Sequence, residues 1–207
     1  ITGGLGGLGL HSARWLVDQG ARHLILTGRR GVQTAEQQAT LDAFQAKGAV
    51  VTVAQVDVAD AAAMTQLLAT IAASEQPLRG VIHGAGVEGN KALRDLQWAD
   101  FVPVLRPKVV GGWLLHRLTA DLDLDFFICY ASGAGTWGGK QQAHYGAANH
   151  FLDGLMAYRR SLGLPGLSIA WGPWAGGGMA GPEARELLEM IGVRAFTPEQ
   201  GLAIQAH

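Results

Sequence analysis

Thr2-Gly3-Gly4-Leu5-Gly6-Gly7-Leu8-Gly9 stands near the start of the chain, directly before the pattern of an amphipathic helix that continues to about Gln19. Glycines in a turn between a strand and a helix let backbone N–H groups approach a phosphate at the N-terminus of the helix. Such turns also occur without a ligand, so their context matters. Here a strand follows the helix at residues 23–27, an order that predicts the start of a dinucleotide-binding α/β fold.

Strand-like and helix-like segments alternate along the rest of the chain. This alternation predicts a Rossmann-like, doubly wound parallel sheet covered by helices on both faces, and we expect one domain over residues 1–207. Two prolines, Pro103 and Pro107, are expected to disturb the long helix that contains them. The further strands are expected at residues 50–55, 80–83, 125–131 and 167–171. The further helices are expected at 34–47, 61–74, 98–120 and 182–191, together with one that contains Tyr145 and ends near 162 and one that begins at 197.

A glycine-rich segment, residues 172–181, follows the last expected strand and lies beside Trp171 and Trp174. Many glycines in one loop favour a mobile lid that closes over substrate. Both indoles could equally belong to the core. We therefore expect a lid region near the C-terminus, with Trp174 and Met179 as candidates to contact substrate.

Bulk composition excludes several classes of protein. The net charge is −1 with 16% charged residues, so the chain shows no basic footprint for nucleic acid. No apolar run approaches the roughly 20 residues that span a membrane. The single cysteine, Cys129, excludes an internal disulfide and fits a reducing compartment, so we expect a cytoplasmic protein without a metal site. The chain opens at Ile1, inside the first expected strand, and we expect a piece of a longer polypeptide.

Four side chains are candidates for chemistry: Tyr145, Ser132, Lys108 and Asn149. A phenol with its ordinary pKa of about 10 is a poor acid at pH 7, but a nearby cation lowers that pKa. Ser132 ends an expected strand, where ligands of open α/β sheets bind. Tyr145 and Asn149 share one helix face at i and i+4. The spacing alone equally fits ordinary helix and loop residues.

Two arginines, Arg29 and Arg30, follow the strand at 23–27, where an acidic residue would bind the ribose hydroxyls of NAD. Two guanidinium groups suit a 2′-phosphate, which favours NADPH, although they also fit a solvated strand end. Asp57 and Asp60 follow the third strand. One of them caps the next helix, and Asp57 is equally a candidate to bind an adenine amino group.

The chain closely resembles the catalytic half of a ketoreductase domain from a modular polyketide synthase, a branch of the short-chain dehydrogenase/reductases. Most of that superfamily carries Tyr-x-x-x-Lys, whereas this chain has Asn149 in the lysine position and Lys108 on the preceding helix. This exchange is characteristic of the polyketide and fatty-acid synthase reductases. The resemblance covers almost the whole chain and rests on TGGLGGLG, TGRRG, VDVAD, GVIHGAGV, LRPKVVGGWLLH, LDFFICYASGAG, YGAANHFLDGL, YRRSLGLPG and WGPWAGGGMA.

The resemblance implies a role for each of these residues. Tyr145 would protonate the ketone oxygen, Ser132 would hydrogen-bond it, and Lys108 would lower the pKa of the tyrosine. Asn149 would hold a water or the lysine for proton resupply. The substrate would be a β-ketoacyl thioester on the phosphopantetheine arm of an acyl carrier protein. NADPH would be held by Gly3, Gly4, Leu5, Gly6, Leu8, Arg29, Arg30, Asp57, Val58, His83, Gly84 and Ala85, together with Lys108 and Tyr145.

The resemblance also implies a stereochemical class. Residues 87–91 lack the Leu-Asp-Asp of one class, whereas Trp137 stands eight residues before Tyr145, as in the opposite, A-type class. Gln142 in place of histidine points to an A1-like reductase that forms an L-hydroxyl from substrates not epimerised at the α-carbon. Trp137 could otherwise simply pack under a loop. His144 departs from the commoner small residue, and we expect it to be a bystander on another helix face.

Two departures from the family pattern stand out. By this resemblance we expect that the N-terminal structural subdomain, which packs beside such a catalytic half, is missing from residues 1–207, and that independent folding of these residues depends on it. Tyr130-Ala131-Ser132 replaces a frequent Ser-Ser pair but keeps the catalytic serine. Two other functions stay open: an architectural or cofactor-binding domain of a synthase, and a free-standing reductase of small ketones or sugars.

Overall fold

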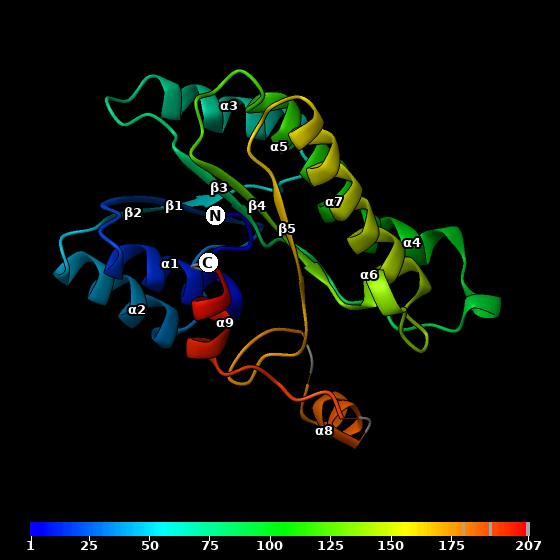
Figure 1. Ribbon diagram of the computed structural model, residues 1–207. Helices are drawn as coiled ribbons and strands as arrows, with labels where there is room; N and C mark the ends of the chain where they lie inside the picture. The colour runs from blue at the N-terminus through cyan, green and yellow to red at the C-terminus, as the bar shows by residue number, and fades with distance from the viewer. Residues whose placement is uncertain (180, 191, 206–207) are drawn as a thin grey trace. The chain divides into compact units, whose positions relative to one another are not determined.

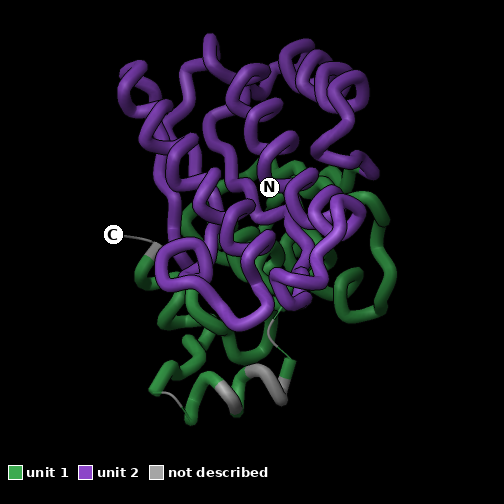
Figure 2. Tube along the Cα trace, turned by 90° about the vertical axis from the view of Figure 1, so that its right-hand side faces the viewer, with its two compact units in different colours: residues 1, 3–54, 172–207 green, residues 2, 55–171 purple. Residues whose placement is uncertain are grey.

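The structure of the chain is a computed structural model that describes residues 1–179, 181–190 and 192–205. The chain divides into two compact units, drawn in green and purple in Figure 2. Unit 1 comprises residues 1, 3–54 and 172–207, and unit 2 comprises residues 2 and 55–171. We describe each unit by itself.

Unit 1 contains a two-stranded sheet of β1 and β2. Thr34 caps α2, because its Oγ1 accepts the N–H of Gln37 at 3.1 Å while the Gln37 side chain accepts the N–H of Thr34 at 3.2 Å. The core of the unit includes Val17, Leu26 and Phe44, all buried. The elements of this unit are α1 (Gly7–Asp18), β1 (His23–Gly28), α2 (Ala35–Ala46), β2 (Val50–Gln55), α8 (Pro182–Met190) and α9 (Pro198–Gln205).

Unit 2 contains a three-stranded parallel sheet in the order β3-β4-β5. Val81 lies opposite Phe127, and Ser132 lies opposite Trp171. Helix α7 packs along β4 and β5, as Figure 1 shows in yellow. The elements are α3 (Ala61–Ala72), β3 (Gly80–His83), η1 (Leu93–Asp95), α4 (Trp98–Leu105), η2 (Arg106–Val110), α5 (Gly111–Leu118), β4 (Phe126–Ser132), α6 (Ala134–Trp137), α7 (Ala143–Ser161) and β5 (Leu167–Trp171).

The apolar run of β4 forms the centre of unit 2. Phe127 and Cys129 are buried on this central strand and pack with Leu152 and Met156 of α7. Each such side chain contributes roughly 1.5–3 kcal/mol when fully buried. The position of β4 between two neighbours explains why its sequence is nearly continuously apolar.

The long helix expected at residues 98–120 is interrupted. Helix α4 passes through a wide π-helical turn, η2, into α5, and Pro107 lies in that turn. Proline lacks a backbone N–H, so the regular helical bonding cannot continue through it. The interruption places Lys108 inside η2, with its side chain buried.

The other expected elements are found with small shifts at their ends, and the α/β class is confirmed. Residues 1 and 2 form no extended strand. Thr2 makes an isolated parallel bridge to His83 within unit 2. Helix α8 ends at Met190, and Ile191, at the expected end of that helix, lies outside the described residues, as does Ala180 of the predicted lid.

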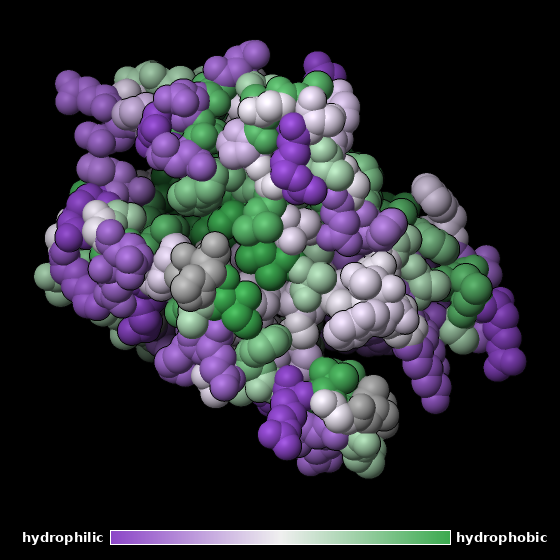
Figure 3. Space-filling model, viewed as in Figure 1, coloured by the Kyte–Doolittle hydropathy of each residue, from purple (hydrophilic) through white to green (hydrophobic). Residues whose placement is uncertain are grey.

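The surface carries both polar and apolar regions. Hydrophilic side chains cover the turn after α3 at the upper left of Figure 3. In η1, Leu93 is 70% exposed beside the exposed charged side chains of Arg94 and Asp95. Within the described residues, the helices are too short or too polar to cross a membrane.

Candidate active site

The C-terminal end of β4 and the first turn of α7 bring Ser132 and Tyr145 together in unit 2. The Ser132 side chain hydrogen-bonds the Tyr145 phenol, and the Ser132 Oγ also accepts the backbone N–H of Ala134 at 3.2 Å. Burial raises the pKa of Tyr145, while the hydrogen bonds from Ser132 and Asn149 act to lower it. The two hydroxyls therefore converge at the strand end, where an α/β sheet binds its ligands.

Asn149 lies one turn along α7 from Tyr145 and is fully buried. Its Nδ2 donates to the backbone carbonyl of Tyr145 at 2.7 Å. In the described part of the chain, its Oδ1 has no hydrogen-bond partner. A buried acceptor without a partner is uncommon and suits a water molecule or a ligand, in keeping with the role that the family resemblance implies.

Lys108 is 2% exposed, and its Nζ donates to the backbone carbonyl of Tyr130 at 2.8 Å. Burial lowers the pKa of Lys108 to about 8, an effect that the charge of Asp153 partly offsets. We expected Lys108 to lower the pKa of Tyr145. The net pKa of Tyr145 is raised, because burial outweighs the hydrogen bonds from Ser132 and Asn149 that favour its phenolate. The effect of Lys108 on this phenol stays a prediction.

Asp153 is a functional candidate that the sequence interpretation missed. It lies four residues after Asn149, which itself lies four residues after Tyr145, so all three share a face of α7. Its Oδ1 accepts the hydroxyl of Ser168 on β5 at 2.6 Å. Continuing the i, i+4 spacing from Asn149 would have identified it as the carboxylate on the helix face of Tyr145.

His83 and Thr2 meet at the C-terminal end of β3. Thr2 Oγ1 lies 2.7 Å from Nδ1 of His83, and it accepts the N–H of Ala85 at 3.3 Å. The N–H of Gly84 donates to the Thr2 carbonyl at 3.0 Å. Burial lowers the pKa of His83 to about 3, and the charge of Lys108 acts in the same direction. The imidazole is thus neutral and fixed at this strand end.

The open question about the two aspartates is partly resolved. Asp60 caps α3, because its Oδ1 accepts the N–H of Ala63 at 3.0 Å. Asp57 Oδ1 accepts the N–H of Ala59 at 2.9 Å, and its Oδ2 lies 3.5 Å from Nε of Arg106, an ion pair that the sequence did not reveal. Val58 is buried beside them. Asp57 therefore remains a candidate to bind an adenine.

In unit 1, the glycine-rich turn folds tightly onto the start of α1. Gly3 has a φ of 66°, which favours glycine, and a Cβ on Gly9 would overlap the Gly3 carbonyl. Gly6 at the N-cap offers no side chain to the first N–H groups of α1. A cofactor phosphate fits such an uncapped helix end. The remaining residues of the expected loop are Gly4 and Leu5, both buried, and Leu8, half-buried.

The glycine-rich segment expected to be a lid lies against this helix end within unit 1. A Cβ on Gly7 would be 2.9 Å from Cα of Gly177. Arg29 and Arg30 are exposed directly after β1. The unit thus carries two features that suit an anionic cofactor: the helix end and the two cations.

The candidates for stereocontrol have different environments. Trp137 is 81% exposed on α6, and Gln142 occupies the N-cap position of α7. Met179 is 40% exposed. Trp174 is 2% exposed, stacks on His11 with ring centres 6.2 Å apart and fills the space beside Gly201. Trp174 therefore packs in the core of unit 1, one of the two environments that the sequence left open, and its contact with substrate stays a prediction.

Among the residues that the structure describes, no group of three or more His, Cys, Asp or Glu side chains could hold a metal ion. Buried Cys129 is free, and burial raises its pKa to about 12. It is therefore a core thiol and not a nucleophile.

A model of the KR domain family matches residues 1–176 of the chain. The chain belongs to the KR domain family. This KR domain is 44% identical over 203 residues to erythronolide synthase EryA3 of Saccharopolyspora erythraea, an alignment that covers 98% of the chain and 6% of that protein. It is also 43% identical over 210 residues to a putative inactive phenolphthiocerol synthesis polyketide synthase, Pks1, of Mycobacterium tuberculosis, with 99% and 13% covered.

Solved structures give the same family. The KR domain is similar to PlmKR1, the ketoreductase of the first module of phoslactomycin biosynthesis in Streptomyces sp. HK803, with 38% identity, a TM-score of 0.94, and 98% of this chain and 48% of that chain covered. An A1-type ketoreductase matches at 42% identity and a TM-score of 0.93, with 98% and 43% covered. These findings confirm the predicted family, the Rossmann-like fold and the class of enzyme, a ketoreductase of the oxidoreductases. The chain spans under half the length of these structures and a small part of the large synthases.

Proposed function

We propose that this KR domain reduces a β-ketoacyl thioester, carried by an acyl carrier protein, to the β-hydroxyacyl thioester during polyketide chain extension, with NADPH as reductant. The observation that carries the proposal is the convergence of Ser132 and Asn149 on the Tyr145 phenol at the end of β4. We propose the acyl carrier protein, a structural subdomain and other synthase domains as partners, in the cytoplasm. The proposal of these partners is supported by the matched relatives, which are large synthases.

NADPH, when bound, supplies the hydride that adds to the ketone carbon. As that C–H bond forms, the electron pair of the C=O bond moves to the oxygen, which takes the phenolic proton of Tyr145. Ser132 donates a hydrogen bond to the same oxygen, which stabilises its developing charge. The phenol of Tyr145 is protonated at neutral pH, as a proton donor must be, although burial raises its pKa and so makes it a weaker acid. Lys108 and the free acceptor of Asn149 then restore that proton through water.

The nicotinamide cofactor is that of the family, and the preference for NADPH is our inference from Arg29 and Arg30. Replacing both with alanine should raise KM for NADPH by roughly tenfold or more, since each charge-assisted hydrogen bond to a phosphate contributes about 1.5–3 kcal/mol. KM for NADH should change little. Arg22, which precedes the other end of β1, is a matched control when changed to alanine. Equal changes with both cofactors would refute the preference.

We also propose an A1-like outcome with an L-hydroxyl product, supported by exposed Trp137 and by the similarity to an A1-type structure. The decisive experiment gives the full-length protein NADPH and a racemic α-methyl β-ketoacyl thioester of N-acetylcysteamine, and resolves the products on a chiral column. One L-hydroxy product with an unepimerised α-carbon is expected. A D-hydroxy product would refute the class, and folded protein that binds NADPH without oxidising it would refute the reductase.

A second function, an inactive architectural domain, is favoured by one observation: the relative from Mycobacterium tuberculosis is a putative inactive synthase. The same turnover experiment separates the two functions. In this chain Tyr145, Ser132, Lys108 and Asn149 are all present, which favours catalysis.

A further inference from the structure

His144, directly before the proposed acid Tyr145, is buried at 2% exposure in the first turn of α7. Its ring packs edge-on against Phe101 of α4, with ring centres 5.7 Å apart at 63°. His144 replaces the small residue that is more common at this position, and its side chain is buried next to Tyr145. This environment does not fit the expectation that His144 is a bystander. Its contacts therefore need an explanation.

The Nε2 and Cδ2 atoms of the same ring lie close to Gly89, in the segment that joins β3 to η1. A Cβ on residue 89 would overlap Nε2 of His144 and lie 2.8 Å from its Cδ2 and 2.7 Å from Cγ2 of Val104. Real Cβ atoms do not approach other atoms so closely, so glycine is required here by space. The Gly89 backbone is held between α7 and α4.

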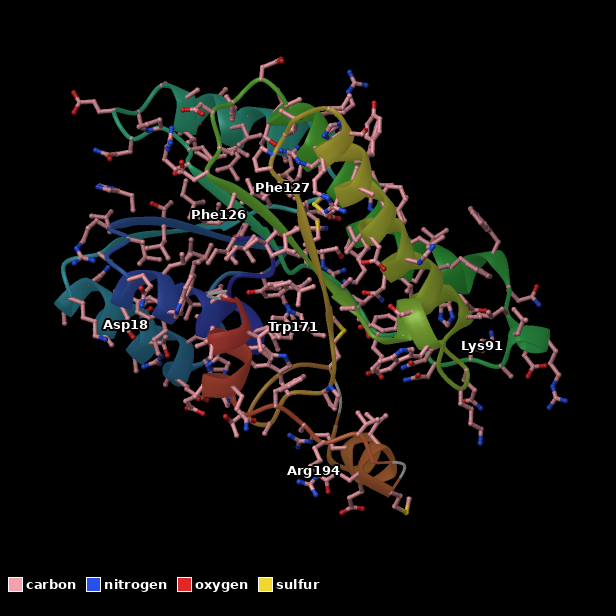
Figure 4. All side chains as sticks on the ribbon, viewed as in Figure 1. Asp18, Lys91, Phe126, Phe127, Trp171 and Arg194 are labelled. Carbon is pink, nitrogen blue, oxygen red and sulfur yellow. The ribbon has the colours of Figure 1, made fainter. Side chains whose placement is uncertain are left out.

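Lys91, which Figure 4 labels, makes two polar contacts that hold the same segment in place. The Lys91 backbone N–H donates to the carbonyl of Gln141 at 2.8 Å, and its Nζ pairs with Asp100 of α4 at 2.6 Å. Gln141 has a φ of 63°, a left-handed conformation that is uncommon for a residue other than glycine. Backbone strain of this kind concentrates where surrounding contacts determine the conformation, often at functional sites.

The fixed segment adjoins the reactive phenol. Glu88, next to Gly89, carries a charge that acts to raise the pKa of Tyr145, so this part of the segment lies within electrostatic reach of the phenol. A shift of the Gly89 backbone would therefore change the wall of the site beside the ketone.

We propose that His144 is a positioning residue that clamps residues 86–91 against α7 and α4, and so fixes one wall of the substrate site beside Tyr145. The consequence for catalysis rests on the proposed reduction, whereas the clamp itself does not. His144 thus acts on the reaction through the Gly89 backbone: loosening the clamp changes how the acyl chain is held and which ketone face is reduced.

The test compares His144→Ala with the wild type in the full-length protein, with His150→Ala as the matched control. His150 lies on the same helix but is exposed. Hydrogen exchange at the Lys91 amide reports whether the segment stays docked. We expect His144→Ala to speed that exchange at least about tenfold and His150→Ala to leave it unchanged. Unchanged exchange in His144→Ala would overturn the clamp.

The product of the β-ketoacyl N-acetylcysteamine thioester gives a readout that general destabilisation would not move. We expect His144→Ala to lower the ratio of the two enantiomers at least about fivefold and to raise KM more than it lowers kcat, which a positioning residue predicts. An unchanged enantiomer ratio would overturn the role in the reaction. Should His144→Ala not fold, Gly89→Ala tests the same contact from the other side, and an unchanged ratio and exchange there overturn the proposal. Absence of turnover in the folded wild type would refute the proposed reduction, while the exchange measurement would still decide the clamp.

Discussion

Arg159 places a guanidinium group in the interior of unit 2, near the C-terminal end of α7, with its side chain fully buried. Its Nε donates to the carbonyl of Pro165 at 2.8 Å, and an Nη lies 3.1 Å from Nδ1 of His116. The guanidinium carbon is 4.1 Å from the centre of the Phe127 ring. A buried charge is tolerated where hydrogen bonds and an aromatic face replace water.

Replacing Arg159 with alanine should lower the free energy of unfolding by about 3 kcal/mol, because the truncation leaves the buried His116 ring nitrogen and the partly buried Pro165 carbonyl without this donor. Urea denaturation measures this change. Arg160→Ala is the matched control, since the neighbouring side chain is exposed and bonds the Gly166 carbonyl. It should cost less than about 0.5 kcal/mol. Equal losses for the two variants would show that the buried network contributes nothing specific.

Among the helices, α5 depends on a glycine where it follows η2. A Cβ on Gly111 would lie 2.7 Å from Cγ1 of buried Val58, whereas a Cβ on Gly154 of α7 would meet nothing within 4 Å. Gly111→Ala should therefore destabilise the fold by roughly 1–3 kcal/mol. Gly154→Ala should stabilise it by about 0.5–1 kcal/mol, because alanine favours a helix.

Thermal unfolding of the two glycine variants tests this contrast, and turnover adds a second readout. Gly111 stands three residues after Lys108, so displacement of α5 should also lower kcat in Gly111→Ala. A stabilising Gly111→Ala would contradict the close packing of α5 on Val58.

The sequence pattern predicted most strands and helices well, because the burial of β3 and β4 requires short apolar runs in the sequence. The pattern could not show the π-helical turn η2, whose wide bonding depends on Pro107 and on the packing around Lys108. It also could not separate Asp57 from Asp60, since both can accept a helix N–H until the chain path is known.

Prediction from sequence was limited in the same way for single residues of the candidate site. The motif predicted that Ser132, Tyr145 and Asn149 meet, but not that burial raises the pKa of Tyr145. The sequence left open whether Trp174 belongs to a lid or to the core, and it indicated that His144 is a bystander, because sequence does not report which side chain a tertiary contact buries. Both are 2% exposed.

At the scale of the whole molecule, the burial of His83 makes stability depend on pH. Burial holds the pKa of His83 at about 3, below its ordinary value of 6.5. Between these two pH values the unfolded chain binds a proton that the folded chain does not. The free energy of unfolding therefore falls as the pH drops from 6.5 toward 3. At about 1.4 kcal/mol per pKa unit, His83 alone contributes on the order of 5 kcal/mol to that loss.

Unfolding free energies between pH 7 and pH 4 test this dependence in the wild type and in His83→Gln, which removes the titrating ring. We expect a weaker dependence on pH in the variant. Parallel curves for the two proteins would show that His83 is not the group that titrates.

The measurement that tests the central claim most directly is NADPH oxidation with a β-ketoacyl N-acetylcysteamine thioester by Tyr145→Phe in the full-length protein. The variant keeps the ring but loses the proton, so turnover should fall by roughly 10²–10⁴ while NADPH still binds. Tyr158→Phe, on the same helix but 46% exposed, should react like the wild type. Turnover that survives in Tyr145→Phe would contradict the assignment of Tyr145 as the proton donor.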